Sequence, residues 1–142
     1  MNAALVLHSG GPTPVINASL LGVVQETRLH PRITALYGAR HGIGGVLRED
    51  LVDLFAIDAN TLNAVARAPS SALGTSRDEL DEEHLERVFS VLEKRAVRYL
   101  LYTGGNGSMG AASRIARHAK SRSYELHVVG IPKTIDNDLS GN

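Results

Sequence analysis

The sequence has no cysteine, no excess of charge of either sign and no long apolar run. The absence of cysteine excludes disulfides, zinc ribbons, cysteine nucleophiles and iron–sulfur ligation, and it is compatible with a cytoplasmic protein. Fifteen Lys and Arg balance 15 Asp and Glu, so no global charge favours nucleic acid or an anionic membrane. The apolar stretch Ala3–Leu7 is too short to span a membrane and lacks the features of a targeting signal. We therefore expect a cytoplasmic protein with neither nucleic acid nor membrane as a partner.

The length and composition predict one folded domain. The chain has 142 residues, of which 43% are hydrophobic and 21% are charged, and its 14 Gly fall in short clusters. A chain of this size can bury about two-thirds of its unfolded surface, and the composition is not that of a collagen-like or disordered chain. No repeat or linker divides it, so we treat residues 1–142 as a single domain.

Apolar runs typical of buried strands alternate with segments of helical periodicity. The expected strands are Ala3–His8, Ile33–Tyr37, Leu51–Leu54, Val97–Thr103 and Leu126–Ile131, and the expected helices are 17–30, Thr61–Arg67, 82–94 and Ser108–Ser121. The Gly-rich residues 38–45 and the small residues 68–75 predict loops. Strands alternating with helices indicate an α/β fold: a three-layer sandwich with a mainly parallel, Rossmann-like sheet.

Three of the expected strands end in loops of unusual composition, at residues 9–12, 103–108 and 132–138. The carboxyl ends of parallel strands meet at one edge of a sheet, so these loops should adjoin. The first two are rich in glycine and lead into helices, an arrangement that brings backbone N–H groups and a helix N-terminus to an anion. Glycines at strand ends also make ordinary tight turns, but two such loops side by side favour a phosphate site.

The third loop, Lys133–Asp138, holds one cation and two carboxylates. In phosphoryl transfer a carboxylate can take the proton of the acceptor hydroxyl, cations stabilise the phosphoryl group, and a second carboxylate can help to hold Mg²⁺. The same composition is also typical of a solvated turn. Arg77 presents a similar choice, between contacting phosphate oxygens and forming a surface ion pair with Asp78 or Glu79.

Two other phosphate-binding patterns match poorly. Gly105-x-Gly107-x-x-Gly110 has the dinucleotide spacing, but the next strand ends in Gly130-Ile131-Pro132 without the carboxylate that would bind a ribose. A nicotinamide-dependent dehydrogenase is therefore the weakest alternative. No Gly-Lys-Ser/Thr sequence is present, which excludes a Walker-type nucleotide site.

Four motifs follow one another along the chain: Ser9-Gly10-Gly11-Pro12-Thr13-Pro14-x-x-Asn17, Leu73-Gly74-Thr75-Ser76-Arg77, Gly104-Gly105-Asn106-Gly107-Ser108 and Gly130-Ile131-Pro132-Lys133-Thr134-Ile135-Asp136-Asn137-Asp138-Leu139. In order and spacing they resemble the 6-phosphofructokinase family, in its ATP-dependent and pyrophosphate-dependent branches. The resemblance covers essentially the whole chain. It implies the N-terminal, donor-binding domain of a glycolytic enzyme that phosphorylates the 1-hydroxyl of fructose 6-phosphate with Mg²⁺ as cofactor.

The resemblance also implies a role for individual residues. Asp136 would be the catalytic base, Thr134 and Ile135 would bind the sugar phosphate beside it, and Asn106 and Asp138 would lie near Mg²⁺. The expected contacts to ATP or pyrophosphate are Gly11, Arg77, Asp78, Gly105, Asn106, Gly107, Ser108 and Lys133.

Three features depart from the family pattern. Asn106 replaces an acidic residue, and an amide oxygen is a weaker ligand for Mg²⁺ than a carboxylate. Gly107 is typical of ATP users and Lys133 of pyrophosphate users; we favour ATP because Gly107 leaves room for a nucleotide. The chain is also less than half as long as the family's enzymes, so the sugar-binding half is expected to be missing.

These departures leave two functions open. The first is a 6-phosphofructokinase that forms a homo-oligomer at full length and of which this isolated chain is inactive or very weak. The alternative is a non-catalytic nucleotide- or phosphate-binding fragment or degenerate paralogue, an interpretation that rests on Asn106 and the short chain.

Overall fold

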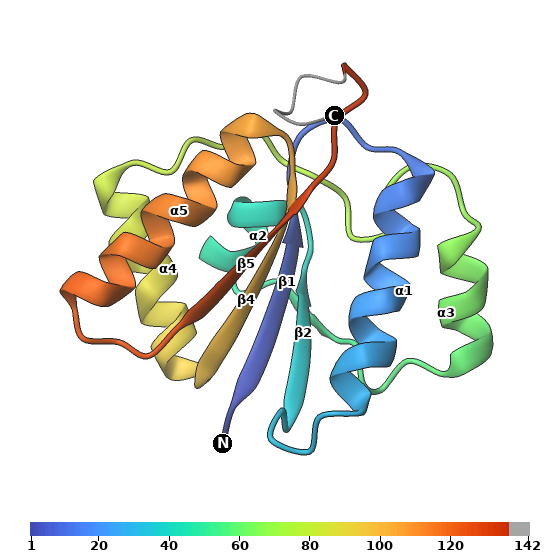
Figure 1. Cartoon of the computed structure of the whole chain (residues 1–142), viewed down its shortest axis with the longest axis horizontal. Coiled ribbons are helices and arrows are strands. Elements are labelled where there is room, and N and C mark those ends of the chain that lie inside the picture. The colour runs from blue at the N-terminus through green and yellow to red at the C-terminus, as the bar shows by residue number, and fades with distance from the viewer. Residues whose placement is uncertain (137–142) are drawn as a thin grey trace.

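A computed structural model of the chain describes residues 1–136 and shows helices on both sides of one central sheet (Figure 1). The strands are β1 (Ala3–His8), β2 (Ala35–Ala39), β3 (Leu51–Asp53), β4 (Val97–Gly104) and β5 (His127–Pro132). The helices are α1 (Pro14–Arg28), α2 (Gly42–Leu47), α3 (Ala59–Ala66), α4 (Glu82–Lys94) and α5 (Asn106–Ser121). Within the described residues, no helix is long and apolar enough to span a membrane.

The five strands lie in the order β3-β2-β1-β4-β5, with β1 at the centre. β1 pairs in parallel with β2 and β4, and β4 pairs in parallel with β5. The chain moves outward from β1 to β2 and β3, and then returns to the other side of β1 as β4. The carboxyl ends of β1 and β4 therefore form a topological switch point, where open α/β sheets bind their ligands.

Each face of the sheet packs against its own set of helices. On one face, Leu5 and Leu7 of β1 belong to a core that includes Phe89 of α4 and Ile115 of α5. On the other, Val6 belongs to a second core formed with α1 and α3. Because alternate residues of a strand point to opposite faces, a central strand must be apolar throughout, and all six residues of β1 are buried. The expected three-layer α/β sandwich is confirmed.

The expected loop at residues 38–45 is wrong, because this segment completes β2 and then forms α2. Ile43 and Val46 of α2 are buried in the same core as Leu5. The glycines permit this close packing: at Gly42, where φ is +60°, an added Cβ would lie 2.6 Å from the His8 carbonyl, and at Gly44 it would lie 2.6 Å from a carboxylate oxygen of Asp78. Tertiary burial thus outweighs the poor helix propensity of glycine.

Other differences concern the ends and directions of elements. β3 runs antiparallel to β2, which the sequence pattern does not indicate. α1 begins at Pro14, one turn earlier than the expected start at Asn17, and α5 begins at Asn106 instead of Ser108. The helix after Asp81 forms as expected, with the Asp81 side chain accepting a hydrogen bond from the His84 N–H at 2.7 Å.

Candidate functional site

A cleft of about 890 Å³ opens at the carboxyl ends of β1 and β4. Its floor and walls come from the end of β1, the N-terminal half of α5 and the segment that leads into α4. The lining residues are Ser9, Gly10, Arg77, Asp78, Glu79, Leu80, Asp81, Glu82, Tyr102, Gly105, Gly107, Ser108, Gly110, Ala111 and Arg114. The cleft therefore lies at the switch point of the sheet, where the topology places a ligand site.

Backbone hydrogen bonds join the three strand-end loops. The Ser9 N–H donates to the Thr103 carbonyl at 2.9 Å, and the Lys133 N–H donates to the Gly104 carbonyl at 2.9 Å. Gly104 lies between them with so little space that a Cβ there would overlap the Ser108 side chain. The expectation that these loops meet at one edge of the sheet is confirmed for the residues up to Asp136.

The N-terminus of α5 faces this cleft. Its N-cap residue, Gly105, has no side chain to cap the helix, and the first turn contains no acidic residue. The unpaired N–H groups and partial positive charge of such a helix end attract phosphate. Added Cβ atoms at Gly107 and Gly110 would meet nothing within 4 Å, so both positions border open space.

Arg77 and Asp78 line the opposite wall of the cleft. Both are exposed, and no ion pair joins the Arg77 guanidinium to Asp78, Glu79 or any other residue in the range 1–136. The surface ion pair favoured by the local sequence is therefore absent from this part of the chain. The guanidinium remains available to phosphate oxygens in the cleft.

Several cleft residues lie outside the sequence motifs, and two of them, Tyr102 and Arg114, have defined polar partners. Tyr102 belongs to β4 and is 3% exposed, yet it forms part of the cleft lining. Burial raises the pKa of the Tyr102 phenol; a hydrogen bond with the Ser9 side chain opposes this change, and the charge of Asp78 adds to it. Tyr102 therefore contributes a neutral hydroxyl beside Ser9. Its position directly before the Gly-rich loop at residues 103–108 is the sequence signal that could have indicated it.

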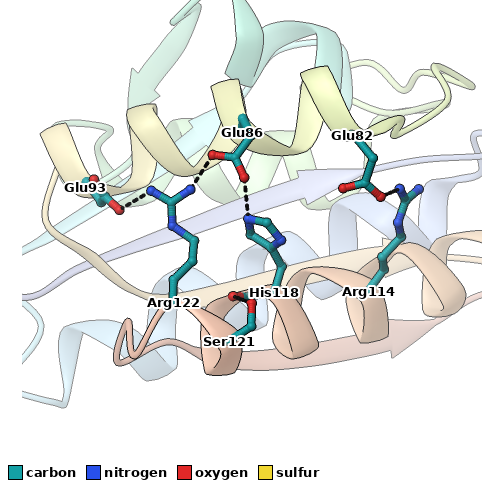
Figure 2. Close-up of polar contacts among 7 residues, drawn as sticks. All are labelled: Glu82, Glu86, Glu93, Arg114, His118, Ser121 and Arg122. Atoms are coloured by element: carbon teal, nitrogen blue, oxygen red, sulfur yellow. Dashed lines mark hydrogen bonds and ion pairs between the residues drawn. The ribbon is translucent and has the colours of Figure 1, made fainter.

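Arg114, the second such residue, lies farther along α5. Its guanidinium donates to the Leu80 carbonyl and to the Glu82 carboxylate, the latter at 2.5 Å. Figure 2 shows this pair beside those that His118 and Arg122 form with Glu86. Surface pairs of this kind contribute little stability individually, but together they join α4 to α5, and the pair of Glu82 and Arg114 lies in the cleft lining.

The third loop forms a separate group next to the cleft. The Lys133 ammonium donates to the Gly11 carbonyl, and the side chain of Ile135 lies 3.8 Å from the position of a Cβ added to Gly11. Ile135 is 74% exposed, Asp136 is exposed, and the Asp136 N–H donates to the Thr134 hydroxyl at 3.1 Å. Gly11 and Lys133 are thus in contact, although they are 122 positions apart.

The predicted site residues consequently fall into two groups. Arg77, Asp78, Gly105, Gly107 and Ser108 line the cleft. The other predicted residues among those described lie outside its lining: Gly11, Asn106, Lys133, Thr134, Ile135 and Asp136. Asp138 lies outside the described residues. The structure brings these residues to one edge of the sheet, while their roles stay predictions.

The described residues do not include a cluster of three or more His, Cys, Asp or Glu side chains that could hold a metal ion. Mg²⁺ commonly binds proteins through one or two carboxylates and completes its coordination with water and substrate phosphates. A Mg²⁺ ion that arrives with a phosphorylated ligand would therefore need few ligands from the protein itself.

Comparisons with known proteins agree with this geometry. The family model for phosphofructokinase matches residues 3–142. The pyrophosphate–fructose 6-phosphate 1-phosphotransferase of Rhodospirillum rubrum is 40% identical over 138 residues, which are 97% of this chain and 34% of that protein. The enzyme of the same name from Xanthomonas campestris is 43% identical over 141 residues, covering 96% of this chain and 33% of the relative.

ATP-dependent relatives and solved structures match as well. The ATP-dependent 6-phosphofructokinase of Staphylococcus aureus is 34% identical over 143 residues, covering 99% of this chain and 42% of that protein. The crystal structure of pyrophosphate-dependent phosphofructokinase from Marinobacter aquaeolei superposes with a TM-score of 0.90 at 36% identity, covering 99% of this chain and 35% of that one. The chain thus spans about a third of the length of the first curated relatives that it matches.

Proposed function

Because the chain belongs to the phosphofructokinase family, we propose that it is the phosphoryl-donor-binding part of a 6-phosphofructokinase, which transfers a phosphoryl group to the 1-hydroxyl of fructose 6-phosphate. The observation that carries this proposal is the cleft at the switch point. There the N-terminus of α5, the Gly-rich segment after β1 and Arg77, which forms no ion pair with any residue in the range 1–136, converge. Together they supply backbone N–H groups and a cation, which can position a phosphoryl group and stabilise its charge during transfer.

We propose ATP as the donor, on steric grounds. The cleft of about 890 Å³ extends from Gly105 along α5 to Arg114, and Gly107 borders it without filling it. This space exceeds what a pyrophosphate alone would occupy. Pyrophosphate is the second candidate, because the relatives at 40% and 43% identity are named for it and because Lys133 adds a cation near Gly11.

The third loop would then hold the acceptor sugar. We assign Asp136 as the base that takes the proton of the 1-hydroxyl, with Thr134 and Ile135 beside the sugar phosphate. Asp136 is exposed at the edge of the sheet, where an incoming hydroxyl can reach its carboxylate. Magnesium, when bound with the donor phosphates, would neutralise part of their charge, and Asn106 and Asp138 are the residues assigned to hold it. A homo-oligomeric, cytoplasmic enzyme of glycolysis is part of the same proposal.

The second candidate function is a binding module that catalyses nothing. It is favoured by one specific observation, the neutral Asn106 at the first position of α5, where a carboxylate would hold Mg²⁺ more strongly. The family assignment leaves the dehydrogenase alternative without support.

Calorimetric titration of the chain with ATP and with pyrophosphate, each in the presence of Mg²⁺, tests the binding part of the proposal. We expect binding that Arg77→Met weakens and that His30→Gln, a variant of an exposed residue outside the cleft lining, leaves unchanged. Binding of neither compound would contradict the proposal. Turnover of fructose 6-phosphate by the complete protein, with and without Asn106→Asp, separates the two functions: activity only in the variant would identify a binding module.

A further inference from the structure

Segment 68–76 leads to Arg77 in the cleft wall, although it forms no helix and makes only a single described β-bridge, from Ser76 to Ser9 directly after β1. Its first half is held by Asn17 of α1, a side chain with no exposed surface. The Asn17 amide nitrogen donates to the Ala68 carbonyl at 3.0 Å, and the amide oxygen accepts from the Ala72 N–H at 2.8 Å. One buried side chain therefore satisfies backbone groups at both ends of a five-residue stretch.

His8, at the end of β1, holds the same segment at its centre. Its Nδ1 lies 3.1 Å from the Ser71 hydroxyl, and that hydroxyl donates its only proton to the Gly74 carbonyl at 3.0 Å. Nδ1 must therefore be the donor to Ser71, which fixes the tautomer of the neutral ring. The series of bonds runs from the central strand through Ser71 to the backbone three residues before Arg77.

The C-terminal end of the segment is hydrogen-bonded at Ser76, the residue before Arg77. The Ser9 hydroxyl donates to the Ser76 carbonyl at 2.8 Å, and the Gly10 N–H donates to the same carbonyl at 3.3 Å. Leu73, between these points, is 6% exposed and packs in the core shared with α1. The backbone that precedes Arg77 is thus fixed by β1, α1 and the core together.

This arrangement is costly for the core. His8 has no exposed surface, and its Nε2 has no hydrogen-bond partner among residues 1–136. A buried polar atom without a partner destabilises the folded state, and an aliphatic residue at the same position on β1 would avoid that cost. Within this range, the hydrogen bond from Nδ1 to Ser71 is the polar contact of the His8 side chain. We therefore expect that the role of His8 is to hold segment 68–76 through that bond.

We propose that His8 and Asn17 are positioning residues, which hold segment 68–76 so that Arg77 stands over the cleft in the place where it meets the donor phosphates. The inference rests on the proposed function, because it requires that the cleft bind phosphates. Neither residue lines the cleft, so each acts on the ligand only through Arg77.

A double-mutant cycle between His8 and Arg77 tests this. Kd values for pyrophosphate and for ATP, each with Mg²⁺, are measured calorimetrically on the chain at pH 7.5 for wild type, His8→Leu, Arg77→Met and the double variant. We expect Arg77→Met to weaken binding about tenfold or more and His8→Leu to weaken it about fivefold. In the Arg77→Met background, His8→Leu should add less than about twofold, because its effect passes through the missing guanidinium.

Two further variants separate positioning from general loss of structure. His8→Asn retains a donor near the position of Nδ1 and should restore affinity to within about twofold of wild type. Thr27→Val, on the same helix as Asn17, removes a buried hydroxyl that bonds only to its own helix, and it should leave Kd unchanged. If His8→Leu does not fold, Ser71→Ala takes its place in the cycle. This variant removes the hydroxyl that bonds to both His8 and the Gly74 carbonyl, and its site is only partly buried.

The outcomes distinguish the two proposals. If wild type binds neither compound, the proposed function fails and this inference fails with it. If wild type binds but His8→Leu leaves Kd unchanged, or weakens binding equally with and without Arg77, then only the positioning role is overturned. If His8→Leu weakens binding only when Arg77 is present, and His8→Asn restores the affinity, the positioning role is supported.

Discussion

His8 should make the stability of this protein depend on pH between 7.5 and 5.5, above the ordinary pKa values of carboxylates. The side chain has no exposed surface, and burial lowers its pKa from 6.5 to about 4. Its described hydrogen-bond partner, Ser71, is uncharged, and burial is the single cause of the shift. Between these two pKa values the unfolded chain binds more protons than the folded protein, so stability falls as pH is lowered from above 6.5 towards 4.

The size of the effect follows from the two pKa values. Lowering the pH from 7.5 to 5.5 should remove about 1.3 kcal/mol of stability through His8 alone, and lowering it to 4.5 should remove about 2.5 kcal/mol. The carboxylates with lowered pKa, such as Glu49 and Asp58, affect stability at lower pH, because their contribution is lost only as pH falls through their folded pKa. The range from 7.5 to 5.5 therefore isolates histidine.

Urea unfolding followed by circular dichroism at pH 7.5, 6.5 and 5.5 measures this dependence. Wild type and His8→Asn share the five other histidines, so the difference between the two curves reports His8. We expect wild type to lose about 1.3 kcal/mol more than the variant over this range. His30→Gln serves as a control, because it removes an exposed histidine paired with Glu26. In this variant the loss of stability that His8 causes should persist. Parallel curves for wild type and His8→Asn would refute the reasoning.

Four substitutions test other parts of the structure. Asp136→Asn in the complete protein should lower turnover of fructose 6-phosphate by about 10²-fold or more while donor binding survives, and unchanged turnover would exclude Asp136 as the base. Gly107→Asp should fold normally, because its Cβ meets nothing within 4 Å, yet calorimetry should show that ATP loses about tenfold or more in affinity while pyrophosphate loses less. Gly104→Val, whose Cβ would overlap Ser108, should cost about 1–3 kcal/mol in urea unfolding. Phe89→Ala, which empties a fully buried site, should cost about 3–5 kcal/mol in the same assay.

Much of the fold was predictable because it depends on local patterns. β1 is an apolar run, since a central strand is buried on both faces. The start of α4 follows from the capping side chain of Asp81. The meeting of the three loops follows from strand direction alone, because parallel strands end at one edge.

The errors arose where packing outweighs local preference. The glycines of α2 indicate a loop by propensity, but the helix forms because Ile43 and Val46 are buried and Gly42 and Gly44 allow close approach. Arg77 has acidic neighbours in sequence, but no ion pair joins it to any of them in the described part of the chain, and it lies on the cleft wall. Tyr102 enters the cleft only because of the orientation of β4.

The sequence by itself determined the α/β class, the three loops at one edge of the sheet and the family, because these depend on periodicity and on motifs of neighbouring residues. Only the tertiary structure decided which residues meet across long separations: His8 with Ser71, Asn17 with Ala72, and Lys133 with Gly11. The physical reason is that such contacts depend on the three-dimensional placement of complete elements, which the pattern of neighbouring residues does not encode.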